Sequence, residues 1–178
     1  LLHQVLASFT GKHLNTRIWE LPLKDLEQEL EEIFAKVAQE ALEQGRIVNS
    51  LLWQTEAPRM LNMLIRWLHY EYEDQKYWSF TPCAVEWDFS SKNGKPLHMR
   101  LNDGTRVSLN GRIDRIDSDG QRLFVTDYKR SSGSVPSSKD LATGFDVQLP
   151  LYMLAVAGLY KDAISVAGGC YYVLQKGE

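Results

Sequence analysis

The sequence predicts an α/β fold, in which a mixed central sheet is flanked by helices and preceded by an extra helical layer. Two observations support this prediction. Apolar residues recur at helical spacing over residues 1–80, whereas residues 81–178 open with short alternating segments that turn residues separate. A further helical pattern and one more strand close the chain. We therefore expect one domain over residues 1–178, with a mainly helical part followed by a sheet core that carries the chemistry.

The composition is that of an ordinary globular protein. The chain has 178 residues, of which 44% are hydrophobic and 24% charged, and its net charge is -3, so any contact with nucleic acid has to be a local patch. Cys83 and Cys170 lie far apart, which argues against a disulfide framework or zinc ribbon and predicts a reducing, cytoplasmic compartment. No apolar run reaches the roughly 20 residues of a membrane helix. Because the chain opens at Leu1 without a Met, we expect it to be part of a longer polypeptide.

Three apolar stripes predict the helices of the first part. The first stripe covers Leu1–Phe9, the second residues 22–45 and the third residues 58–74. The second and third begin with a proline, which fits a first helical turn because its missing N–H would have no partner there. We expect these helices to form a layer without chemistry of their own.

Alternating segments and turn residues predict the strands of the second part. The strands are expected at Ala84–Phe89, Leu97–Leu101, Arg106–Asp117, Arg122–Arg130 and Ile164–Leu174, with turns at Asn93-Gly94 and Asp103-Gly104. A helix is expected before the last strand, from about Lys139 or Asp146 to Leu159. Its start stays open because Gly144 and Pro150 interrupt the pattern.

The central candidate site lies on the hairpin around Asp119-Gly120, a dipeptide that strongly favours a tight turn between strands. Side chains alternate along a strand, so Asp127 and Lys129 share one face while Tyr128 takes the other. Asp114 on the partner strand can reach the same place. Two carboxylates on one side of a ribbon are costly unless a cation binds between them, and hard divalent metals prefer carboxylate oxygens.

A metal held by two acids suits the hydrolysis of a phosphodiester, because it makes water nucleophilic and neutralises the charge that develops on phosphate. The neighbouring Lys129 could orient or deprotonate the water, or hold the phosphate. The alternative is a solvated surface hairpin without chemistry, and the spacing Asp-x-Lys taken alone favours that alternative.

Four more residues are candidates whose roles depend on packing. Gln148 and Tyr152 share one helical face and could contact the lysine or a phosphate, or else merely anchor the helix end. His3 could ligate the metal if its helix packs over the acidic face, although a histidine beside an apolar stripe is more often a core residue. Glu86, in the middle of a strand, is a further acid or a residue that simply faces solvent.

Four motifs occur in one order along the chain. They are Leu1–Leu6 (LLHQVL), Gly111–Asp117 (GRIDRID), Val125–Lys129 (VTDYK) and Gln148–Tyr152 (QLPLY). Together they resemble the RecB-like branch of the PD-(D/E)xK nuclease superfamily, and most of all the C-terminal nuclease domains of AddB-type helicase–nuclease subunits. The resemblance covers nearly the whole chain and outweighs the surface-hairpin alternative.

The resemblance implies a restriction-endonuclease-like core and a Mg²⁺- or Mn²⁺-dependent DNA nuclease, an exonuclease of a helicase–nuclease complex in double-strand-break repair and recombination. It implies metal ligation by His3, Asp114, Asp127 and the backbone carbonyl of Tyr128, a catalytic role for Lys129 together with the motif residues Gln148 and Tyr152, and an accessory role for Glu86. Many relatives bind an iron–sulfur cluster through four cysteines. Neither Cys83 nor Cys170 matches that pattern, so no cluster is supported within this chain.

The implied partners are a DNA strand or end, helicase domains of the same polypeptide and a partner subunit. Local DNA contacts are expected from the cations near the hairpin, which are Arg112, Arg115, Arg130 and Lys139. The alternative function is a non-catalytic DNA-binding module with the same fold. A degenerate copy of that kind should have lost Asp114, Asp127 or Lys129, and this chain has all three.

Overall fold

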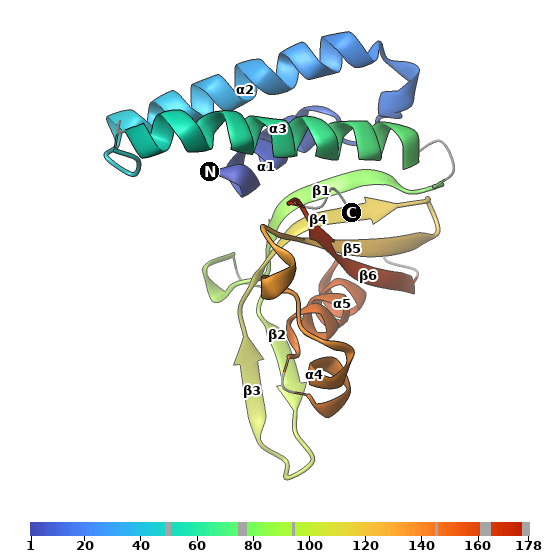
Figure 1. Cartoon of the computed structure of the whole chain (residues 1–178). Coiled ribbons are helices and arrows are strands. Elements are labelled where there is room, and N and C mark those ends of the chain that lie inside the picture. The colour runs from blue at the N-terminus through green and yellow to red at the C-terminus, as the bar shows by residue number, and fades with distance from the viewer. Residues whose placement is uncertain (49–50, 75–77, 94, 145, 161–164, 176–178) are drawn as a thin grey trace.

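The computed structural model describes residues 1–48, 51–74, 78–93, 95–144, 146–160 and 165–175. Its centre is a four-stranded mixed sheet in the order β1-β4-β5-β6, with a helical layer on one face and α5 on the other (Figure 1). The first three strands of that order are antiparallel neighbours, and β6 lies parallel to β5. The predicted α/β class with a mixed sheet is confirmed.

The helical layer contains α1 (Leu2–Lys12), α2 (Leu23–Glu43) and α3 (Leu51–Asp74), with the short 3₁₀ helix η1 (Ile18–Glu20) after α1. Each α-helix buries its apolar stripe in one shared core, with Leu6, Leu30 and Leu64 all fully buried. Such amphipathic helices form because the stripe gains more by leaving water than a lone helix gains from propensity. The first two predicted helices are confirmed.

The start predicted for the third helix is wrong. Helix α3 begins at Leu51, so that Pro58 lies inside it rather than in its first turn. Leu51 and Leu52 are 79% and 71% exposed, so no buried stripe marks this first part of the helix in the sequence. Gln54 and Pro58 are both exposed, so water can satisfy the Gln54 carbonyl that the missing proline N–H leaves without a helical partner.

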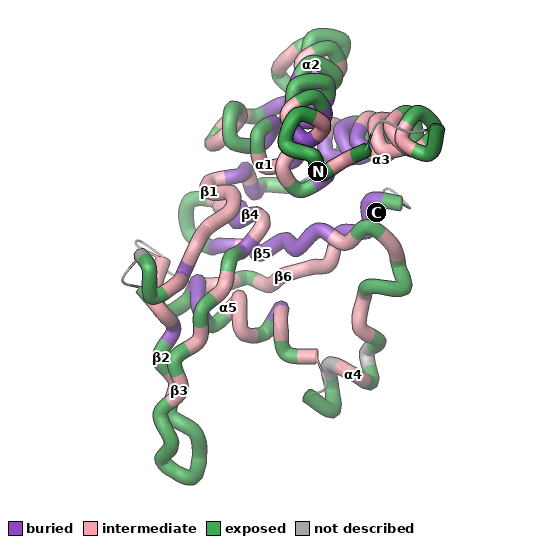
Figure 2. The backbone as a smooth tube through the Cα atoms, turned by 90° about the vertical axis from the view of Figure 1, so that its left-hand side faces the viewer, coloured by how far each residue is buried: buried purple, intermediate pink, exposed green. Residues whose placement is uncertain are grey.

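The strands of the main sheet are β1 (Thr81–Asp88), β4 (Arg112–Ser118), β5 (Arg122–Lys129) and β6 (Ser165–Val173). Successive residues of β5 point to opposite faces. Val125 packs in the core beneath α5, whereas Tyr128 packs in the core of the helical layer, with its ring 6.2 Å from that of Trp67. Figure 2 shows how buried residues gather along these strands and on the sides of the helices that face them.

The strand predicted over Arg106–Asp117 is two strands. Its first half, β3 (Arg106–Leu109), pairs with β2 (Leu97–Arg100) in a separate hairpin that extends away from the main sheet (Figure 1). The break falls at Gly111, where a Cβ atom would lie 2.4 Å from the ring of Phe89. A residue with a side chain could not pass so close to a buried aromatic ring, so glycine permits the change of direction.

The helix predicted before the last strand is also two helices, α4 (Ser138–Thr143) and α5 (Gln148–Leu159). Gly144 ends the first with a φ of 73°, and Pro150 sits in the first turn of α5, where proline is tolerated. Two short 3₁₀ helices, η2 (Ser91–Asn93) and η3 (Ser132–Ser134), complete the chain. The predicted turn residue Gly94 and the predicted first residue of the last strand, Ile164, lie outside the described residues.

Within the described ranges, no helix is both long enough and apolar enough to cross a bilayer.

Candidate active site

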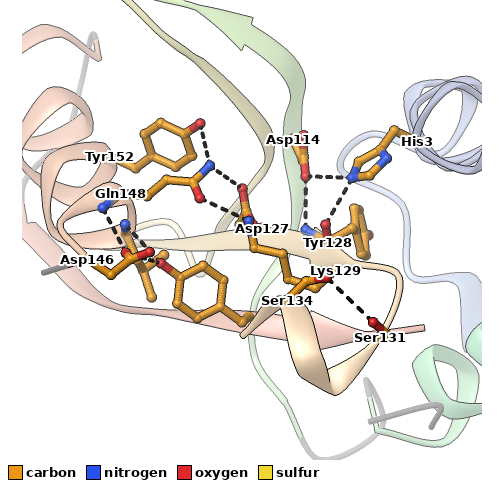
Figure 3. A network of polar contacts seen from close by, with 12 residues as sticks. His3, Asp114, Asp127, Tyr128, Lys129, Ser131, Ser134, Asp146, Gln148 and Tyr152 are labelled. Carbon is orange, nitrogen blue, oxygen red and sulfur yellow. Dashed lines mark hydrogen bonds and ion pairs between the residues drawn. The ribbon is translucent and has the colours of Figure 1, made fainter. Parts of the chain in front are cut away.

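Most of the predicted site residues line a pocket of about 580 Å³ between α1, the ends of β4 and β5, η3 and α5. Its lining residues are His3, Arg112, Asp114, Asp127, Tyr128, Lys129, Arg130, Ser134, Gln148 and Tyr152. The sheet supplies the acids and the lysine, and helices from opposite ends of the chain supply the histidine and the amide (Figure 3). Residues more than a hundred positions apart therefore meet in one cavity.

One side of the pocket joins α1 to the two central strands. Nε2 of His3 lies 2.9 Å from the carbonyl oxygen of Tyr128 and 3.5 Å from Oδ2 of Asp114. The same carboxylate oxygen accepts the backbone N–H of Tyr128 at 2.9 Å. Because the carbonyl only accepts hydrogen bonds, His3 carries a proton on Nε2 in this arrangement. The imidazole thus contacts both the carboxylate and the carbonyl.

The other side of the pocket is a network centred on Gln148. Its amide oxygen accepts from Lys129 Nζ at 2.9 Å, while its amide nitrogen donates to Asp127 Oδ1 at 3.2 Å and to the Tyr152 hydroxyl at 2.9 Å. Nζ of Lys129 also lies 2.7 Å from Asp127 Oδ2, and the two side chains are 18% and 5% exposed. This contact is an ion pair whose geometry is not that of a hydrogen bond. The Oδ2 atom is buried and has no hydrogen-bond partner.

The electrostatics of the pocket disfavour the ionised form of Asp114. Burial raises the pKa of Asp114, and the nearby charges of Asp127 and Glu86 raise it further, while the bond from Tyr128 N–H and the His3 ring oppose the shift. Asp127 has Lys129 as its counter-ion, whereas Asp114 has the partly exposed His3. A cation between the two acids would offset this repulsion.

The donor set suits a hard divalent cation. Two carboxylates, one carbonyl and one imidazole are ligands that Mg²⁺ and Mn²⁺ accept, and the imidazole already contacts the carbonyl and the Asp114 carboxylate. Asp127 is the exception, because Lys129 and Gln148 hold its carboxylate. Accordingly, within the part of the chain that the structure describes, no three His, Cys, Asp or Glu side chains are grouped as metal ligands. The buried, bond-free Oδ2 of Asp127 is the oxygen that a cation would satisfy.

Glu86 lies beside the pocket rather than in it. It lines a neighbouring cavity with His3 and Arg112, and its carboxylate pairs with Arg112 at 2.8 Å. Its φ of 47° falls in the left-handed region, which is rare for a residue with a side chain in the middle of a strand. Such local strain is common next to functional sites, where it redirects a side chain.

The expected DNA contacts have different surroundings. Arg112 and Arg130 lie on the pocket rim and pair with Glu86 and Glu56 at 2.8 and 3.0 Å. Their side chains are 65% and 56% exposed, so both are accessible to a ligand. Lys139 lies on α4, farther from the acids.

The prediction that Arg115 contacts DNA is wrong, because its side chain is only 5% exposed and points into the helical layer. Its guanidinium pairs with Glu71 of α3 and with Asp117 at 2.8 Å each, and it donates to the Tyr128 hydroxyl at 3.2 Å. Strand alternation places the Arg115 side chain on the face of the sheet opposite to Asp114, so it supports the site from the helical layer. Sequence reasoning did not identify Glu71 or the pocket residue Ser134, and neither has a motif that would mark it.

Comparison with known proteins gives a consistent result. A family model described as the PD-(D/E)XK nuclease superfamily matches residues 1–178. An ATP-dependent helicase/deoxyribonuclease subunit of Alkaliphilus oremlandii is 31% identical over 185 residues, covering 97% of this chain and 16% of that protein. The proteins of the same name from Clostridioides difficile and Clostridium acetobutylicum are 30% and 37% identical, over 90% and 63% of this chain. The chain spans 10–16% of the length of these three relatives.

Proposed function

Because the chain belongs to the PD-(D/E)XK nuclease superfamily, we propose that it is a divalent-metal-dependent deoxyribonuclease that hydrolyses phosphodiester bonds. The observation that carries the proposal is the pocket itself. It brings together two acids, a histidine, a backbone carbonyl and a lysine held by an amide, from four separate segments of the chain. Each of these groups has a part in phosphodiester hydrolysis, and a surface hairpin without chemistry would need none of them.

Each side chain has a distinct role in this proposal. His3, Asp114, Asp127 and the Tyr128 carbonyl would hold Mg²⁺ or Mn²⁺, which activates water and neutralises charge on the phosphate when it is bound. Lys129 would present its ammonium group to the water or to the phosphate. Two further residues would orient it, since Gln148 accepts a hydrogen bond from it at 2.9 Å and Tyr152 in turn contacts Gln148.

The setting of this activity follows from the names of the relatives. They are subunits of helicase/deoxyribonucleases, and this chain matches only a small part of their length. We therefore propose that the chain is one nuclease domain of a longer cytoplasmic polypeptide, with helicase domains, a partner subunit and DNA as its partners. Trimming of DNA ends by exonuclease action during break repair and recombination is the corresponding process.

The alternative is a module of the same fold that holds DNA without cutting it. The placement of Lys129 favours catalysis over this alternative. A residue that only attracts phosphate works from an exposed surface, whereas this ammonium group is 18% exposed and held between Asp127 and Gln148. Such positioning of a buried charge is a feature of reaction centres.

A metal titration tests the proposal. A labelled DNA strand is incubated with the protein over a range of Mg²⁺ concentrations, in parallel with Asp127→Ala and with Asp25→Ala, an exposed acid of α2, as the matched control. We expect metal-dependent cleavage by the wild type and the control, and none by Asp127→Ala, because too few oxygens remain to hold the ion. Cleavage by Asp127→Ala near the wild-type rate would refute the site, and strand binding without cleavage by the wild type would support the alternative.

A further inference from the structure

The β2–β3 hairpin has two chemically different faces. Leu97 pairs with Leu109, and Leu97, Leu109 and Met99 pack into the core beneath α5. The opposite face carries Arg100 and Arg106, both exposed. One face therefore fixes the hairpin to the body of the protein, and the other is left to solvent.

The two arginines face each other directly. Arg100 is the last residue of β2, Arg106 is the first of β3, and their Cα atoms are partners in the register of the hairpin. Like charges directly opposite each other on a strand pair destabilise it. No carboxylate among the described residues pairs with either guanidinium. Among the described residues, therefore, neither arginine stabilises the hairpin through an ion pair.

The turn between the arginines does not compensate their charge. Asp103 is the single acid of residues 95–109, a segment that also holds three Lys or Arg residues. Its carboxylate accepts the Thr105 N–H at 2.9 Å, and that bond lowers the pKa of Asp103. The acid thus closes the turn, and the hairpin stays locally basic on a chain whose net charge is -3.

The hairpin leads directly to the active site. Beyond the bend at Gly111 the same chain becomes β4, with Arg112 and Asp114 in the pocket. Both views show the hairpin tip as the part of the molecule farthest from the helical layer (Figures 1 and 2). Eight residues separate Arg106 from Asp114, so this arginine lies within about 27 Å of the acid, at roughly 3.3 Å per residue.

The geometry points to a second DNA contact, in which Arg100 and Arg106 bind the backbone phosphates of the substrate outside the active site. This inference rests on the proposed function for the identity of the substrate. A guanidinium matches the geometry of a phosphate with two parallel hydrogen bonds, and a phosphate between the arginines would remove their mutual repulsion. The upper limit of about 27 Å corresponds to at most about eight base pairs of duplex at 3.4 Å each, so a longer duplex can contact both sites at once.

The test compares Arg100→Ser/Arg106→Ser with a matched control, Lys24→Ser/Lys36→Ser, which removes two exposed cations from α2. Binding to labelled duplexes is measured across a salt series, with Ca²⁺ replacing Mg²⁺ to suppress cutting. We expect the arginine variant to bind duplexes much longer than about eight base pairs more weakly, with a log–log salt slope lower by about two. All affinities of the control should match the wild type.

Several outcomes would overturn the inference. Equal slopes for wild type and arginine variant on long duplexes would do so, as would an equal loss of affinity by the arginine variant and the control. If the arginines only prevent edge-to-edge pairing of hairpins, the variant will self-associate while its DNA affinity stays unchanged. Thermal unfolding should show a variant at least as stable as the wild type, because a repulsive pair is lost. Failure of the wild type to cleave would refute the proposed function, yet the binding slopes would still decide this inference.

Discussion

Replacing Arg115 by methionine tests whether this residue supports the fold rather than the DNA. Its guanidinium is the counter-ion of two buried acids, Glu71 and Asp117, whose side chains are 10% and 3% exposed. Arg115→Met preserves much of the volume and removes the charge. Both carboxylates then lose the Arg115 cation, and breaking such a buried pair costs about 3–5 kcal/mol. That is a large part of the roughly 5–15 kcal/mol by which domains are stable.

The pH dependence gives this prediction a second readout. Burial raises the pKa of Asp117 to about 6 even with Arg115 present, so the native state holds a proton that the unfolded chain has lost between about pH 4 and 6. Stability from this group is therefore fully present below pH 4 and lost as the pH rises to 6. Without Arg115, whose charge lowers the pKa of Asp117, this carboxyl stays protonated to higher pH. The deficit of the variant should thus grow between pH 5 and 7, by on the order of 1 kcal/mol.

Urea unfolding at pH 5 and pH 7 measures both quantities, with Arg122→Met as the matched control. Arg122 pairs with Asp119 at an exposed turn, where an ion pair contributes about 1 kcal/mol or less. A loss below about 1 kcal/mol for Arg115→Met, or a loss that does not change with pH, would contradict the description of a buried ion network. Weaker DNA binding at unchanged stability would instead restore Arg115 as a DNA contact.

Two more variants test the site and its support. Lys129→Ala should reduce cleavage at least a hundredfold, because that is a typical contribution of a positioned acid–base group. Its affinity for Mn²⁺, measured by calorimetry, should stay unchanged. A loss of metal affinity equal to that of Asp114→Ala would mean that the roles are wrongly assigned. Gly111→Ala should lower the free energy of unfolding by about 1–3 kcal/mol, because its Cβ would lie 2.4 Å from the buried Phe89 ring; an unchanged urea midpoint would show that the ring can move aside.

Local patterns predicted much of the sheet and of the pocket. Alternation on β5 placed Asp127 and Lys129 on one face and Tyr128 on the other, as the structure has them, because a strand reverses its side chains at every residue. The spacing of Gln148 and Tyr152 likewise put both on one face of α5. The chemical roles assigned to these residues remain predictions.

Features that depend on the docking of distant elements could not be predicted. Arg115 looked like a free cation because its partner Glu71 is 44 positions away, on a helix whose contact with the sheet no local pattern reveals. The strand breaks at Gly111 because the ring of Phe89, which belongs to another segment, packs against this glycine. The left-handed backbone of Glu86 has no sequence signal, since residues other than glycine rarely adopt it.

Tyr128 takes part in both halves of the molecule at once. Its backbone N–H and carbonyl contact Asp114 and His3, while the residue is 3% exposed, with its ring among aromatic residues of the other face. A substitution that removes only the packing of the ring would shift two backbone atoms of the active site, although no atom of the side chain lies in that site. An activity screen would then classify Tyr128→Ala together with the loss of a metal ligand. Phenylalanine restores the volume of the ring but not the hydroxyl that accepts from Arg115 at 3.2 Å, so recovery of activity by Tyr128→Phe would identify the lost packing as the cause.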